Sequence, residues 1–145
     1  MSKSTEDQKI AGNQDNISGG YKLSIFSGKA ELEVRNSVNA LRNNRFVNGG
    51  TILKSGVWYH IVGTYRQGGS IKTYVNAKLD REQKTTNILA ASSGPLKIGC
   101  EPFNDSICLF NGLIDDVRIY NYALSEADIS KLSIGKQLAL GTSGK

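Results

Sequence analysis

Residues 21–34 read YKLSIFSGKAELEV, and this stretch decides the fold class. Apolar and polar residues alternate over 21–25 and again over 30–34, which is the pattern of β-strands with one buried face. Residues 27–29 (Ser-Gly-Lys) lie between the two runs and have the composition of a tight turn. The stretch therefore predicts an antiparallel β-hairpin.

Further short strands are expected after this hairpin. Residues 57–65 are apolar on both alternating faces, which predicts a central strand that is covered on each side. The glycine-containing loop 66–70 leads to a strand at 71–75, and two more strands are expected at 96–99 and 113–120. Such closely spaced strands are typical of a β-sandwich.

A single helix is expected near the end of the chain. Ser125 has the position of an N-cap, Glu126 and Asp128 lie in the first turn, and Gly135 is expected to end the helix. Short strands with one helix predict an all-β fold, an antiparallel β-sandwich with one short C-terminal helix. Residues 1–19 lack periodicity and predict a flexible lead-in, followed by one domain over residues 20–145.

The composition agrees with one water-soluble domain. The chain has 145 residues, of which 39% are hydrophobic and 21% are charged, with 16 glycines and 2 prolines. These values exclude collagen-like and intrinsically disordered classes. No apolar run reaches the roughly 18 residues of a membrane span, and the polar beginning does not resemble a signal peptide, so no membrane insertion is expected.

The positive charge is concentrated in the middle of the chain. The net charge is +5, but residues 29–97 alone hold 11 basic and 4 acidic residues, a net charge of +7. This excess suggests either solvated polar faces of strands or a surface for an anionic partner such as an acidic polysaccharide. The basic residues are spaced singly and form no Lys/Arg block, so nucleic acid is not an expected partner.

Three segments together resemble a known family. They are 58–65 (WYHIVGTY), 71–76 (IKTYVN) and 110–125 (FNGLIDDVRIYNYALS), and they resemble the laminin-G-like jelly rolls of the concanavalin A-like lectin/glucanase superfamily. The resemblance covers roughly residues 20–134. It implies a jelly-roll β-sandwich and an extracellular or cell-surface binding module for carbohydrate or a protein surface. The basic middle of the chain directs the ligand hypothesis toward acidic glycans.

The chain also departs from the family pattern. Arg66 stands where the family usually has Asp, and Ala77 where it usually has Gly, both at turns. Residues 1–20 match none of the strands with which the family usually begins, so the resemblance implies an open sheet edge. A homodimer that covers this edge is therefore expected. The alternative function is a structural or oligomerisation domain without a small ligand.

The residues do not predict an enzyme. Related glucanases carry two catalytic carboxylates in an E-x-D-x-x-E pattern, which is absent here. Glu31 and Glu33 share a strand face, but we expect them to lie with Arg35 on a solvated face. His60 is the single histidine and is expected to be packed and hydrogen-bonded. A glycoside hydrolase or lyase remains the less favoured alternative.

Sugar binding requires aromatic rings and planar polar groups, because a pyranose presents apolar C–H faces ringed by hydroxyls. The candidate ligand-binding residues are Asn43, Arg45, Tyr65, Arg66 and Tyr74. For the two tyrosines, packing in the core or at its rim is favoured over a role as sugar-binding platforms.

Metal and cysteine chemistry is confined to one loop and the last strand. Ca²⁺ is a possible cofactor, with Asn104, Asp105 and Asp116 as candidate oxygen ligands, although Asp116 could instead bond Arg118. Cys100 and Cys108 flank seven loop residues, which favours a disulfide in an oxidising compartment over free thiols. Zinc is not favoured, because the histidine is distant in sequence.

Overall fold

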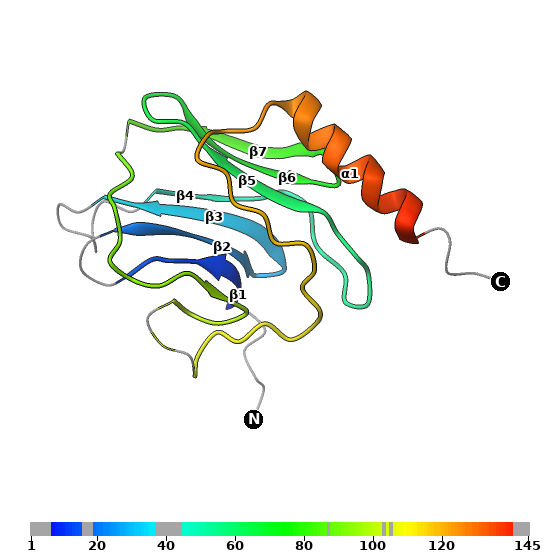
Figure 1. Ribbon diagram of the computed structural model, residues 1–145, viewed down its shortest axis with the longest axis horizontal. Coiled ribbons are helices and arrows are strands. Elements are labelled where there is room, and N and C mark those ends of the chain that lie inside the picture. The colour runs from blue at the N-terminus through cyan, green and yellow to red at the C-terminus, as the bar shows by residue number, and fades with distance from the viewer. Residues whose placement is uncertain are drawn as a thin grey trace.

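Two antiparallel sheets form the computed structural model, which describes residues 7–15, 19–36, 45–86, 88–102, 104 and 106–140 (Figure 1). The five-stranded sheet has the order β4-β3-β2-β1-β8 and the three-stranded sheet the order β5-β6-β7. This architecture confirms the predicted all-β sandwich. The strands are β1 Asp7–Gly12, β2 Gly20–Phe26, β3 Lys29–Arg35, β4 Arg45–Asn48, β5 Ile61–Tyr65, β6 Ser70–Val75, β7 Lys78–Lys84 and β8 Lys97–Ile98.

The predicted hairpin is confirmed as β2 and β3. Its register pairs Leu23 with Leu32 and Phe26 with Lys29. Ser27 and Gly28 form the turn with φ values of 48° and 73°, the left-handed conformations that a two-residue hairpin turn requires. The hairpin places alternate residues of β3 on opposite faces of the sheet.

The hydrophobic core lies between the two sheets. Leu32, Val34 and Val47 of the larger sheet pack with Ile71 of β6. Gly63 of β5 allows the sheets to approach closely, because a Cβ atom added there would lie 2.9 Å from Leu32 Cδ1. The core is therefore organised around the face of β3 that carries Leu32 and Val34.

The flexible lead-in predicted for residues 1–19 is wrong for Asp7–Gly12. These residues form β1, which lies between β2 and β8 in the sheet. The sequence does not predict this strand, because one of its buried positions is occupied by Lys9 and not by an apolar residue. Lys9 is only 1% exposed. Ion pairing of the Lys9 ammonium makes this burial possible.

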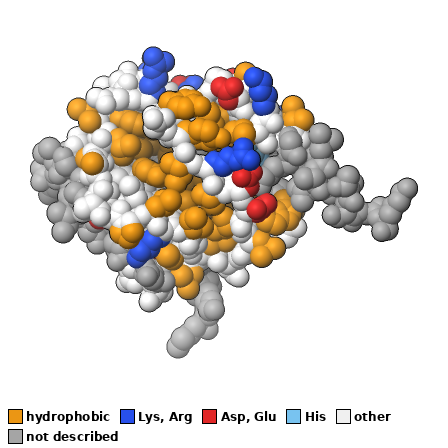
Figure 2. Space-filling model, viewed as in Figure 1, with side chains coloured by type: hydrophobic (Ala, Val, Ile, Leu, Met, Phe, Trp, Pro, Cys, Tyr) orange, Lys and Arg blue, Asp and Glu red, His pale blue; other side chains and the backbone are white. Residues whose placement is uncertain are grey.

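Residues 57–65 do not form the predicted central strand. Only the second half is a strand, and β5 is the edge of its sheet in the described part of the chain. Residues 113–120 are likewise not a strand, because no described strand pairs with them. Their apolar side chains reach the surface, and Figure 2 shows hydrophobic side chains gathered across the middle of this face. The most exposed of them are Leu113 (77%) and Ile119 (50%), and Tyr122, just after this segment, is 62% exposed.

Two further differences lie at β7 and the helix. Residues 80–87 are polar and lie outside the strands predicted from the sequence, but most of them belong to β7, whose side chains are largely exposed on both faces. Helix α1, Glu126–Leu140, begins as predicted, with the Asp128 N–H donating to Ser125 Oγ at 3.2 Å. It continues through Gly135 because good helix formers follow and one glycine costs only about 1 kcal/mol. No helix of the described residues is long and apolar enough to cross a membrane.

Replacing Ala77 by glycine is expected to stabilise the fold. Ala77 lies in the β6–β7 turn with a φ of 66°, beside Asn76 at 50°. The left-handed conformation costs a residue with a Cβ atom about 1 kcal/mol, so Ala77→Gly should raise the free energy of unfolding by about 0.5–1 kcal/mol in urea denaturation. Gly68 has a similar φ of 68° in open space, so Gly68→Ala is the reciprocal control and should be destabilising. Unchanged or reduced stability of Ala77→Gly would contradict this account.

Candidate functional site

One end of the sandwich brings together basic residues that are distant in sequence. Arg45 begins β4 and pairs with Val34 near the end of β3. Arg66 follows β5, and Lys84 ends β7 opposite Ser70. Two hydrogen bonds hold these strand ends together: the Leu89 N–H donates to Tyr65 Oη at 3.2 Å, and the Ala90 N–H to the Arg35 carbonyl at 3.0 Å. We call Arg45, Arg66 and Lys84 the basic end.

The basic end is chemically suited to anions. All three side chains are exposed, and none of them forms an ion pair with another described residue. Glu82 lies nearby on β7, but its carboxylate is paired with Lys72 Nζ at 3.4 Å. A guanidinium group presents planar N–H donors that match a carboxylate or sulfate with two parallel hydrogen bonds. The basic end therefore offers positive charge that no salt bridge to a described residue neutralises, although the Lys84 charge also acts on the Glu82 carboxylate and helps to lower its pKa.

The other predicted ligand-binding residues have different positions. Asn43 lies outside the described residues. Tyr65 is half-buried at the rim of the core, where its hydroxyl accepts the bond from Leu89. Tyr74 is only 2% exposed, so its ring is packed inside the protein, as in the alternative interpretation of the sequence. Of the predicted ligand-binding residues that the structure describes, Arg45 and Arg66 are exposed to solvent, and both belong to the basic end.

A shallow groove lies at the opposite end of β6. It has a volume of about 360 Å³ and combines a tyrosine with amide, ammonium and carboxylate groups. Asp80 holds one wall of the groove by accepting hydrogen bonds from the Gly50 and Thr51 N–H groups at 3.0 and 2.9 Å. The groove is the second place where a sugar could contact the protein. Its lining residues are Thr51, Tyr59, Val75, Asn76, Lys78, Leu79 and Asp80.

The outer face of the larger sheet carries a row of charges that is buried. Glu31, Glu33 and Arg35 of β3 are 8%, 6% and 8% exposed, so the prediction of a solvated face is wrong. Burial is tolerated because the charges neutralise one another across strands. Lys22 Nζ of β2 lies 2.9 Å from Glu33 Oε2, and Arg35 Nε lies 3.2 Å from Glu33 Oε1. We call Lys22, Glu31, Glu33 and Arg35 the buried charged row.

The two glutamates of the row differ in their electrostatic surroundings. Burial raises the pKa of Glu31, with Lys22 and the Ser24 hydroxyl only partly opposing this effect. Burial alone would also raise the pKa of Glu33, but the charge and hydrogen bond of Lys22, assisted by Arg35, hold it below its ordinary value. Catalytic pairs of carboxyl groups often have one raised and one lowered pKa. Here both side chains are buried, so a glycosidic bond cannot reach them.

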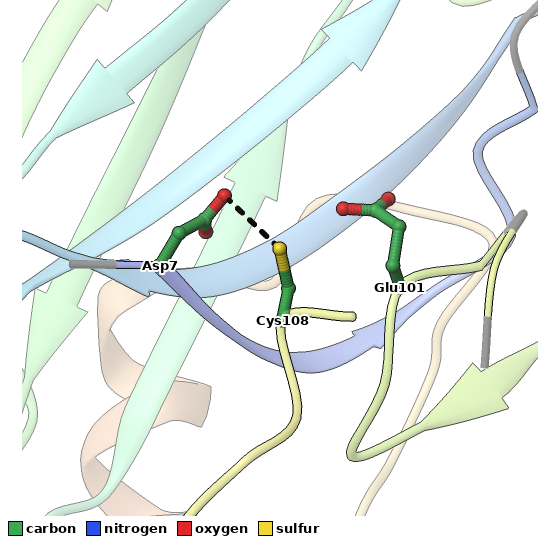
Figure 3. Close-up of side chains that lie close together, drawn as sticks. All are labelled: Asp7, Glu101 and Cys108. Atoms are coloured by element: carbon green, nitrogen blue, oxygen red, sulfur yellow. Dashed lines mark hydrogen bonds between the residues drawn. The ribbon is translucent and has the colours of Figure 1, made fainter. Parts of the chain in front are cut away.

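A second cluster joins the beginning of the described chain to the loop after β8 (Figure 3). The Cys108 thiol donates to Asp7 Oδ2 at 3.7 Å, and Glu101 points toward the same sulfur. One ligand atom from each of Asp7, Glu101 and Cys108 lies within 4.8 Å of the others. Lys9 Nζ contacts Asp7 Oδ1 and lies 3.5 Å from Glu101 Oε2. We call Asp7, Glu101 and Cys108 the Asp-Glu-Cys cluster.

The predicted calcium ligands do not form this cluster. Asn104 Oδ1 accepts a hydrogen bond from the Ser106 N–H at 3.0 Å, and Asp105 lies outside the described residues. Asp116 is exposed and accepts a hydrogen bond from Arg118 Nε at 2.8 Å, which is the alternative that the sequence offered. Within the described ranges, the group of three or more metal-ligating side chains is the Asp-Glu-Cys cluster.

Both cysteines are free thiols in this structure, so the favoured disulfide between Cys100 and Cys108 is not formed. Burial, followed by the nearby Asp7 carboxylate, raises the pKa of the Cys108 thiol. A thiol in this environment is held protonated and serves as the hydrogen-bond donor that the neighbouring carboxylate requires. The Cys108 thiol is therefore hydrogen-bonded to the Asp7 carboxylate.

Sequence reasoning missed three residues of these sites, namely Lys84, Asp7 and Glu101. The sequence predicts no strand around Lys84 and places Asp7 in the lead-in. The signal for Lys84 is its place in a hairpin register opposite Ser70, which becomes visible only once β7 is recognised. Asp7 and Cys108 are 101 residues apart, so no local pattern connects them.

Comparison with known proteins places the chain in a family. The family profile described as the concanavalin A-like lectin/glucanases superfamily (Laminin_G_3) matches residues 1–130. No curated protein matches the chain. The match therefore includes residues of β1 as well as the segments that carried the resemblance.

Two solved binding domains share the fold, and a third structure is similar over most of this chain at a lower TM-score. The receptor binding domain of botulinum neurotoxin D is 20% identical with a TM-score of 0.64, the match covering 93% of this chain and 34% of that chain. The binding domain of botulinum neurotoxin serotype G is 20% identical with a TM-score of 0.62, covering 90% and 31%. An S-layer domain-containing protein from Clostridium thermocellum is 23% identical with a TM-score of 0.45, covering 92% and 65%. This chain thus spans less than two thirds of each.

The two-sheet architecture and the profile match agree. The profile extends over most of the chain, and the jelly-roll neighbours share the sandwich fold. The chain belongs to the laminin-G-like family of the concanavalin A-like lectin/glucanase superfamily.

Proposed function

We propose that this protein is a non-catalytic module that binds acidic glycans through its basic end, in an extracellular or cell-surface setting. The observation that carries the proposal is the convergence of Arg45, Arg66 and Lys84 at one end of the sandwich without an ion pair to any described acidic residue. Anionic sugars are the class of carbohydrate that such a surface attracts. Membership of a lectin-like family and the shared fold of toxin binding domains support a binding role.

The burial of Glu31 and Glu33, the two glutamates that share a face of β3, supports a role without catalysis. Retaining glycosidases need two carboxyl groups about 5 Å apart that both reach the sugar bond. Glu33 is tied to Lys22 and Arg35, and Glu31 is buried beside them. Neither carboxyl group is placed to protonate a leaving group on a bound glycan.

A double substitution at the basic end is expected to weaken glycan binding. On a glycan array at low salt, the wild-type protein should bind sulfated or uronic-acid sugars, and Arg45→Gln/Arg66→Gln should lose most of this signal. Each exposed guanidinium contributes up to about 1 kcal/mol, so the combined loss in affinity is about 30-fold. Binding should also fall when the ionic strength is raised, because the charges are exposed and screened.

The matched control lies outside the basic end. Lys54→Gln/Lys78→Gln removes the same amount of charge from exposed positions, and Lys78 lines the groove. This variant should keep acidic-glycan binding. If the control loses binding while the arginine variant retains it, the groove is the site and the assignment to the basic end is wrong. A blank array at both salt concentrations would refute glycan binding altogether.

The second candidate is an oligomerisation domain, and the exposed apolar face favours it. Leu113, Ile119 and Tyr122 are 77%, 50% and 62% exposed, and contiguous apolar surface of this kind is typical of protein interfaces. A second copy that adds a strand along residues 113–120 would form a homodimer. Light scattering at micromolar concentration should then give a dimer mass, and a monomer mass would contradict this candidate.

A further inference from the structure

We propose that the Asp-Glu-Cys cluster is a binding site for a divalent transition metal of the zinc class. The inference is independent of glycan binding, because the cluster lies on β1 and the loop after β8 and shares no residue with the basic end. Asp7 supplies one carboxylate oxygen, Cys108 its sulfur and Glu101 a second carboxylate oxygen. Three protein ligands leave a coordination position for water or another donor.

An unsatisfied buried atom points to a missing partner. Glu101 is only 3% exposed, and its Oε1 atom has no hydrogen-bond partner in the structure. A buried carboxylate oxygen without a partner costs about 1–3 kcal/mol or more, so such atoms are rare in folded proteins. Lys9 is not this partner, because its ammonium lies 3.5 Å from the other oxygen, Oε2. A cation among the three ligand atoms would satisfy Oε1.

The distances are close to those of tetrahedral zinc. Zn–S and Zn–O bonds of about 2.3 and 2.0 Å at a tetrahedral angle separate sulfur from oxygen by about 3.5 Å. The Cys108 Sγ to Asp7 Oδ2 distance is 3.7 Å, and all three ligand atoms lie within 4.8 Å of one another. Small side-chain movements, without a change of backbone, would bring them to bonding distance.

The charges also favour a divalent ion. With the thiol deprotonated on binding, Asp7, Glu101 and Cys108 carry three negative charges, and Lys9 contributes one positive charge. A divalent cation neutralises the remaining two. The charge of Glu101 also contributes to the raised pKa of Lys22. The positive charge of Lys22, however, is compensated directly by Glu33, which it contacts at 2.9 Å.

The thiolate ligand selects the class of metal. Calcium and magnesium prefer six or more oxygen ligands and bind thiolates poorly, whereas zinc and cobalt accept mixed sulfur and oxygen sets. Metal binding must displace the proton of Cys108, so about one proton should be released per ion bound. The site is thus distinct from a calcium site built on Asn104 and Asp116.

Titration of the reduced 145-residue chain with Co²⁺ tests the proposal. The expected result is a thiolate-to-cobalt charge-transfer absorption in the near ultraviolet that saturates at one ion per chain and disappears on addition of Zn²⁺. Cys108→Ser should abolish this absorption. Glu101→Gln should weaken cobalt binding by at least about 100-fold, because even residues that only orient ligands cost 10–100-fold. Asp7→Asn gives the same test if Glu101→Gln fails to fold.

The second thiol provides the matched control. Cys100 lies in the same loop region but outside the cluster, so Cys100→Ser should retain the absorption band and the affinity. The proposal is overturned if Co²⁺ produces no charge-transfer band, if Cys108→Ser retains it, or if both serine variants lose it. The last outcome would indicate a site made of two thiolates. Far-ultraviolet circular dichroism of each variant establishes that it is folded.

Discussion

Replacing Glu33 by alanine is expected to lower the free energy of unfolding by about 3–5 kcal/mol, because it leaves buried cations without their counter-charge. Lys22 Nζ lies 2.9 Å from Glu33 Oε2, and both residues are buried. Arg35 loses its bond to the same carboxylate, although it keeps the Asp15 carbonyl as a partner at 3.0 Å. Urea denaturation at neutral pH measures the loss.

A double variant separates charge imbalance from lost packing. Lys22→Met/Glu33→Leu replaces the pair by apolar side chains of similar size, and such replacements are often neutral or stabilising. We expect it to recover most of the stability that Glu33→Ala loses, with a remaining deficit from Arg35. If the double variant is as unstable as the single one, the pair is not the reason for the loss.

The same row determines how stability depends on pH. The pKa of Glu33 is lowered in the folded protein, so its contribution is present above the pKa of the unfolded chain and is lost as the pH falls through the folded value. The pKa of Glu31 is raised, so its contribution is present below the unfolded pKa and is lost as the pH rises through the folded value. Glu31→Gln should therefore be neutral or stabilising at neutral pH, in contrast to Glu33→Ala.

Truncation of Ile71 to alanine is expected to cost about 2–5 kcal/mol of folding free energy. Ile71 is completely buried and is the residue through which β6 contacts Leu32, Val34 and Val47 of the other sheet. Its loss leaves a cavity between the sheets that the surrounding strands cannot fill without moving. Chemical denaturation gives the change in stability.

Two controls give the expected gradation. Ile71→Val removes one methylene group and should cost about 0.5–1.5 kcal/mol. Leu79→Ala removes a side chain that is 45% exposed on β7, so it should cost much less than Ile71→Ala. Equal losses at positions 71 and 79 would contradict the placement of the core between the two sheets.

The sequence predicts strands well where one face is apolar. The β2–β3 hairpin follows directly from its alternation and its Ser-Gly turn. β1 and β7 escape the same reasoning for opposite reasons. β1 buries Lys9 in an ion pair on the outer face of the sheet, so a buried position looks solvated in the sequence. β7 exposes both faces and shows no apolar period. Residues 113–120 have the period of a strand, but a strand also requires a neighbour for its backbone hydrogen bonds.

The candidate sites depend on contacts between distant segments. Arg45 and Arg66 could be identified individually as exposed polar groups, but their convergence follows from the pairing of β3 with β4 and the packing of Tyr65 at the same end. Tyr74 lies on the face of β6 opposite to Ile71, and its burial there depends on neighbours such as Thr64 and Glu126 that are distant in sequence. The Asp-Glu-Cys cluster joins the beginning of β1 to the loop after β8, and these two strands are neighbours in the sheet despite their separation in sequence.

The central claim is that positive charge at the basic end binds acidic glycans, and a matched pair of ligands tests it most directly. Calorimetric titration would compare a sulfated, uronic-acid-containing oligosaccharide with its desulfated, carboxyl-reduced counterpart, using the wild-type protein and Arg45→Gln/Arg66→Gln. We expect the wild-type protein to bind the charged sugar, with an affinity that falls as salt is added, and the double variant to bind it about 30-fold more weakly. Equal affinity of the wild-type protein for the charged and uncharged sugars, or unchanged affinity of the double variant, would contradict the claim.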